Sequence, residues 1–249
     1  MKQARQFPRL IAEFFVIVIG VLVALGVDEF AQGREDRSSE RAYLLGIAED
    51  VRQDSVELSE RAQAWSQWGD YAEQLLIGVQ NGALDDHVSL FELVREAGLI
   101  AIPVSAAATY EDLIASGGLG LIRNRDLRMT ISSYYALRPE NVTYYERLDL
   151  RFRQVSREIL PPRLAEETRG RCPLASGALT LAREVRGCPE PPGFDRSRTL
   201  ERLLTYPGIE DILRSRARDL IRGSALLWGR VESATELLRL IETHSPAST

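Results

Sequence analysis

An almost uninterrupted apolar run near the N-terminus constrains this chain more than any other feature. Residues 10–27 read LIAEFFVIVIGVLVALGV, and Glu13 is the only charged residue among them. A helix of this length extends about 27 Å, close to the thickness of the hydrocarbon core of a bilayer. The run is apolar on every helical face, which disfavours a core helix with one polar side. The sequence therefore predicts one transmembrane helix over residues 10–27.

The charges on either side of this run predict its orientation. Three cations lie within residues 1–9, whereas Asp28 and Glu29 follow the run directly. Positive charges next to a span remain on the cytoplasmic side, so residues 1–9 are expected in the cytoplasm. We therefore expect a single-pass protein of the bacterial inner membrane, with the lipid bilayer as one partner and the rest of the chain periplasmic or extracellular.

A cleaved signal peptide is the alternative interpretation of the same run. Ala24 and Gly26 are small residues at a workable cleavage spacing. Against this, Glu13 is unusual in a signal peptide, and the run exceeds the usual apolar length of about 7–15 residues. Under both interpretations the domain that follows is expected outside the cytoplasm.

The composition predicts an all-α protein. The chain has 249 residues, 45% of them hydrophobic, which is enough for one sizeable core. Ala, Leu, Arg and Glu dominate, as in helical proteins, and Lys2 is the only lysine, a bias typical of a GC-rich bacterial genome. The net charge is −5. Because the three cations of residues 1–9 precede the apolar run, the rest of the chain is more acidic than this total suggests. An acidic domain disfavours nucleic acid as a partner.

Two long helices with a seven-residue apolar repeat are expected to form the body. In the first, the repeat positions are Leu44, Val51, Leu58, Trp65, Ala72 and Val79. In the second, they are Leu213, Leu220, Leu227, Ala234 and Ile241. A repeat of this length predicts two helices that pack at a shallow angle in an elongated antiparallel bundle. A seam between two copies of the chain is the alternative use of the same repeat.

The charge pattern divides the rest of the chain. Residues 28–42 are expected to form a charged juxtamembrane helix or linker, with a continuous helix favoured. Residues 43–244 are expected to form the extracytoplasmic helical domain, and residues 245–249 a disordered tail. Shorter helices are predicted near residues 88–99, 106–115, 126–137 and 141–159.

Turn and capping residues support these shorter helices. Gly117 and Gly118 are expected to end the second of them, and Asn124 or Asp126 to cap the third. Pro139 can occupy the first turn of the fourth.

Cys172 and Cys188 bracket a segment rich in glycine and proline. Two cysteines in an exported loop predict a disulfide, which would close the loop beside the helices. Two unpaired thiols are the alternative. Zinc is less favoured, because His87 and His244 are the only histidines that could complete a site.

Two stretches carry a resemblance to a known family. The first is AEFFVIVIGVLVALGVDEF, residues 12–30, and the second is TYEDLIASGGLGLIRNRDLRMTISSYY, residues 109–135. The matching positions of the second stretch are Tyr110, Leu113, Ser116, Gly117, Leu127, Arg128, Tyr134 and Tyr135. Over about half of the chain, it resembles a family of uncharacterised bacterial single-span membrane proteins, a domain of unknown function. The resemblance implies a membrane anchor and a helical outer domain but no activity, and GVDEFAQG departs from the polar residues usual after the span.

Tyr110, Arg128, Tyr134 and Tyr135 are expected to converge near the glycine turn of the second stretch. They can tie two helices together through hydroxyl and guanidinium groups. Alternatively, they form a patch for a partner or ligand, since aromatic and arginine side chains are common binding anchors.

The sequence offers no clear catalytic, cofactor or metal site. A P-loop needs a lysine after its glycines, and none follows the glycines at 117, 118 and 120. His87 is interpreted as part of a helix cap. We therefore expect a membrane-anchored, non-enzymatic helical module for protein binding or envelope scaffolding, with a protein partner or a homo-oligomer. A ligand-sensing domain that signals through a membrane partner is the alternative. An enzyme that uses Glu111 and Asp112 is the weakest hypothesis.

Overall fold

Helices alone make up the regular structure of the described chain. A computed structural model describes residues 7–138, 148–161, 163 and 190–244, with the backbone alone for residues 7–17 and 24. Every regular element in these ranges is an α-helix or a short 3-10 helix. The predicted all-α class is confirmed.

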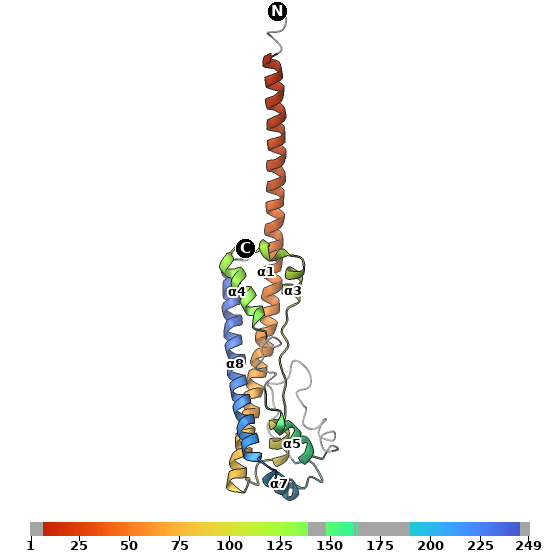
Figure 1. The fold of residues 1–249 in the computed structure, drawn as a ribbon, viewed down its shortest axis with the longest axis vertical. Coiled ribbons are helices and arrows are strands. Elements are labelled where there is room, and N and C mark those ends of the chain that lie inside the picture. Colours follow the sequence, from red (N-terminus) through yellow and green to blue (C-terminus); the bar gives the residue numbers. More distant parts are fainter. Residues whose placement is uncertain (1–6, 139–147, 162, 164–189, 245–249) are drawn as a thin grey trace, which may run out of the picture.

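Helix α1 (Phe7–Asn81) is a single helix of 75 residues. Its second half packs against the rest of the molecule, whereas its first half projects away from it (Figure 1). The helix passes through residues 28–42 without a break, as the favoured interpretation of that segment required. It ends where Gly82 adopts a positive φ of 68°, a conformation that glycine accommodates without strain.

The predicted membrane span requires correction. Within the residues that the structure describes, no helix is both long enough and apolar enough to cross a membrane. Side chains are described from Val18 onward, and a span-length window that begins there already contains Asp28, Glu29, Arg34 and Glu35. The finding contradicts the transmembrane helix over residues 10–27, the single-pass inner-membrane localisation and the periplasmic or extracellular placement of the domain.

Helix α8 (Ile209–His244) lies along the second half of α1 and runs in the opposite direction (Figure 1). The five residues of its predicted seven-residue repeat are all buried. A hydrogen bond links the two helices near the middle of their contact, where the Ser224 hydroxyl donates to the carbonyl of Ala62 at 2.7 Å. These two helices form the rod around which the other elements are placed.

The shorter helices pack at the two ends of this rod. Near its lower end lie α2 (Leu90–Ala97), α5 (Arg151–Ile159) and α7 (Arg196–Leu204). Beside the middle of α1 and the C-terminal half of α8 lie α3 (Ala108–Ala115), the 3-10 helix η1 (Gly118–Leu121) and α4 (Arg125–Ala136). The sequence had not predicted α7 or η1.

The structure supports the local signals used to place these helices. Gly117 adopts a positive φ of 70° after α3, and the Asn124 side chain accepts a hydrogen bond from the Leu127 amide at the start of α4. The helix expected over residues 141–159 begins only at Arg151, because the described residues 148–150 are not helical; residues 139–147 lie outside the described residues.

The predicted disulfide also requires correction. The described residues contain no disulfide, and Cys172 and Cys188 lie outside them. The bridge therefore finds no support in the structure.

Buried charges fasten the lower helices to the rod. Arg216 of α8 is 1% exposed, and its guanidinium donates to the carbonyl oxygens of Ala97, at 2.8 Å, and Leu99 at the end of α2. Ala97 is the last residue of α2, where carbonyls lack a partner within the helix, so the arginine satisfies a group that would otherwise be costly to bury. From α1, Trp68 donates its indole N–H to Glu96 at 3.1 Å.

Among the glycines at the contact between the long helices, Gly223 leaves the least room for a side chain, because it faces Trp65. A Cβ atom built on Gly223 would lie 2.1 Å from Cζ3 of the Trp65 ring. The ring has little freedom to move, because it is fully buried and its indole N–H donates to the Ala101 carbonyl at 2.9 Å. Position 223 therefore requires glycine for the two helices to keep this separation.

We expect Gly223→Ala to lower the free energy of unfolding by about 1–3 kcal/mol, because the added methyl group overpacks the seam. Gly229→Ala on the same helix is the matched control. A Cβ atom there meets nothing within 4 Å, so it should be neutral or stabilising by up to about 1 kcal/mol. Denaturant unfolding of the full chain measures both, and equal stabilities would contradict this account of the seam.

Candidate functional site

The structure brings three of the four predicted patch residues together. The rings of Tyr110 and Tyr135 stack with centroids 4.2 Å apart, and Tyr134 meets Tyr135 edge-on at 5.2 Å. Arg128 points elsewhere, since its guanidinium donates to the Ile122 carbonyl at 3.2 Å. Tyr134 and Tyr135 are buried, so they join α3, α4 and α1 and offer little surface to a partner.

Asp54 of α1 is the polar centre of this region. It is 1% exposed, and its carboxylate accepts hydrogen bonds from the Tyr134 hydroxyl at 2.9 Å and the Ala106 amide at 2.5 Å. One turn earlier, Asp50 accepts from the Thr109 amide at 2.9 Å. Helix α3 has no side-chain cap of its own, so Asp50 satisfies one of its free amides from another helix.

Burial and charge keep Tyr134 protonated. Burial raises the pKa of the Tyr134 hydroxyl well above its ordinary value, and the nearby Asp54 carboxylate raises it further. The Arg230 guanidinium lies 4.1 Å from the Tyr134 ring centroid and donates to the Tyr134 carbonyl at 2.8 Å. Burial, followed by the charge of Asp50, likewise raises the pKa of Tyr135. These tyrosines can act as hydrogen-bond donors but not as bases.

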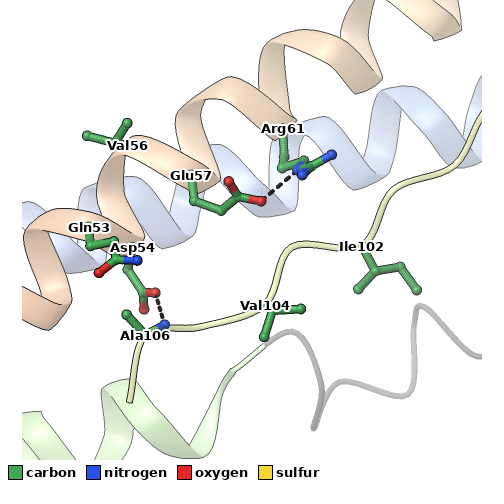
Figure 2. A pocket seen from close by; sticks show the side chains of 8 residues that line it. All are labelled: Gln53, Asp54, Val56, Glu57, Arg61, Ile102, Val104 and Ala106. Atoms are coloured by element: carbon green, nitrogen blue, oxygen red, sulfur yellow. Dashed lines mark hydrogen bonds and ion pairs between the residues drawn. The ribbon is translucent and has the colours of Figure 1, made fainter. Parts of the chain in front are cut away.

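A pocket of about 520 Å³ opens beside Asp54, between α1 and the extended segment before α3 (Figure 2). It is lined by Gln53, Asp54, Val56, Glu57, Arg61, Ile102, Val104 and Ala106. Glu57 and Arg61 form an ion pair of 2.7 Å with side chains 17% and 13% exposed. The Asp54 carboxylate already accepts two hydrogen bonds, so the pocket combines a shielded ion pair with apolar walls. Such a lining suits binding better than proton transfer.

A second exposed feature is the projecting part of α1. Its large apolar side chains are 53–66% exposed and comprise Ile19, Val21, Leu22, Val23, Leu25, Val27 and Phe30. The rest of the molecule first fastens to α1 near Glu40, which accepts from the Arg123 amide at 2.7 Å, and Tyr43, whose hydroxyl donates to Asp112 at 3.1 Å. A contiguous apolar surface of this kind marks an interaction site more often than scattered apolar residues do.

Sequence reasoning missed the buried carboxylates and the pocket beside them. One signal was available: Asp50 and Asp54 are four residues apart on α1 and flank the apolar repeat. Their partners could not be identified, because the contacts join residues more than 50 positions apart. Across the described ranges, no group of three or more histidine, cysteine or acidic side chains is placed to hold a metal ion.

Comparison with known proteins finds no matching family model, curated protein or solved structure. The resemblance to a family of uncharacterised membrane proteins therefore stays a prediction.

We expect Asp54→Asn to lower the free energy of unfolding by about 1–3 kcal/mol, because the two hydrogen bonds to a charged carboxylate become one to a neutral oxygen and one in which the Tyr134 hydroxyl must accept. Asp70→Asn, at an exposed position of the same helix, should change it by less than about 0.5 kcal/mol. In a double-mutant cycle, Tyr134→Phe should lower the free energy of unfolding by less in the Asp54→Asn variant than in the unaltered chain. Strictly additive costs would show that the two side chains are not coupled.

Proposed function

We propose that this chain is a non-enzymatic protein-binding module, in which a rigid helical body presents the projecting part of α1 to a protein partner. The observation that carries the proposal is the row of seven large apolar side chains, all more than half exposed, between Ile19 and Phe30. A helix that is apolar around its whole circumference gains stability when it is covered. Covering each such side chain contributes roughly 1.5–3 kcal/mol.

The body is suited to hold this helix in a fixed direction. α1 continues unbroken from the projecting part into the seam with α8, so the docking surface and the core share one helix. Buried contacts along the seam, among them the one between Trp65 and Gly223, restrict bending of the rod. Fixing the helix before binding lowers the entropy lost when a partner docks.

Small-molecule sensing is the second candidate function. The pocket beside Asp54 has a volume of about 520 Å³, within the range of about 300–1,000 Å³ that is common for ligand sites. A ligand there would touch α1 and the segment that leads into α3. Retention of a stoichiometric small molecule that Val104→Trp removes would favour this function.

Site-specific photocrosslinking tests the leading proposal. With benzoylphenylalanine at Val27, which is 63% exposed, the full chain in its native cells should form adducts with protein of one or a few defined masses. Met129, which is 58% exposed on α4, is the matched control and should give none. Adducts from Met129 alone, or from neither position, would contradict docking through the projecting helix.

A further inference from the structure

On the projecting part of α1, residues spaced alternately three and four apart form one continuous face of the helix. Resting on the proposed function, we propose that the protein partner of this face is a second copy of the same chain, paired in parallel and in register over residues 23–34. The face consists of Val23, Gly26, Phe30 and Gly33, whose spacing of three and four residues places them on one side of the helix.

This face continues the established seam of the body. Within the body, Leu44, Val51 and Leu58 stand seven residues apart on α1 and are at most 3% exposed where α8 covers them. Counting back from Leu44 by sevens leads to Phe30 and Val23. α8 ends at His244, which lines the same surface pocket as Arg37 and Leu44. Beyond that level Arg37 interrupts the apolar repeat, and Phe30 and Val23 resume it where no described helix covers α1.

The two glycines on the face allow a close approach. A Cβ atom built on Gly26 or on Gly33 meets nothing within 4 Å. In a parallel pair, the Phe30 ring of one copy can therefore pack over the glycines of the other. Phe30 is 66% exposed in the single chain, so this contact would remove the most exposed aromatic ring of the segment from water.

Charge favours a second copy in parallel over other helical partners. In a parallel pair with Val23 and Phe30 at the central positions, Glu29 of one helix flanks Arg34 of the other, and the symmetry of the pair repeats the contact. Pairs at these flanking positions are the ones that set partner choice and direction in two-helix assemblies. Arg37 follows at the next central position, where two like charges would meet, so the pairing should end there.

Cysteine crosslinking of the full chain in cells tests the pairing. In a background with Cys172→Ser and Cys188→Ser, Phe30→Cys should form a covalent dimer on mild oxidation. Leu25→Cys is the matched control, because Leu25 is 60% exposed on another face of the same helix and should crosslink much less. Equal crosslinking at both positions, or none at Phe30→Cys, would overturn the parallel pair.

Charge reversal supplies an independent readout. Arg34→Glu should lower the crosslinked fraction of Phe30→Cys, by roughly fivefold for a change of about 1 kcal/mol in pairing, and adding Glu29→Arg should restore it. Both residues lie on the projecting helix away from the core, and circular dichroism verifies that the variants fold. An unchanged fraction in Arg34→Glu would overturn the assigned register. If Val27 photocrosslinks to a different protein while Phe30→Cys gives no dimer, self-pairing fails and the proposed protein-binding function stands.

Discussion

The packing of α1 against α8 is the constraint on which the rest of the structure depends. The two helices approach closely only because small groups, above all Gly223, face large ones such as Trp65. That approach places Ser224 within reach of a backbone carbonyl of α1 and Arg216 within reach of the end of α2. Without this seam, neither group of short helices would have a surface to pack on.

Both groups of short helices, the lower group of α2, α5 and α7 and the upper group of α3, η1 and α4, are attached to the rod by an apolar cluster and by buried polar contacts. In the lower group, aromatic and aliphatic side chains such as Phe91 and Phe152 supply most of the burial, and Arg216 satisfies carbonyls that would otherwise lack partners. In the upper group, Asp50 and Asp54 hold the start of α3 through backbone amides. These directional hydrogen bonds fix the position of α3, while the apolar cluster around Leu113 and Ile131 supplies burial.

Much of the fold could be predicted from the sequence, because the relevant signals are local and periodic. The seven-residue repeats identified both long helices, and Asn124 and Gly117 marked helix ends that the structure confirms. Helix α7 directly follows a proline-rich stretch and was missed, although its cap, Asp195 accepting from the Arg198 amide, has the usual three-residue spacing. The role of Asp54 could not be predicted, since it depends on partners 52 and 80 residues away. The apolar run was assigned to a membrane, and the described helix does not support that assignment.

The central claim is that the projecting part of α1 is covered by a second copy of the chain, which pairs with it over residues 23–34. Amide hydrogen exchange of the full chain at several protein concentrations measures this cover directly. Amides of an uncovered helical segment exchange faster than those of a covered one, because covering the segment raises the free energy of local opening. The account predicts that residues 23–34 are protected at high concentration and lose protection on dilution, while residues 44–79 stay protected throughout. Fast exchange of residues 23–34 at every concentration would contradict it.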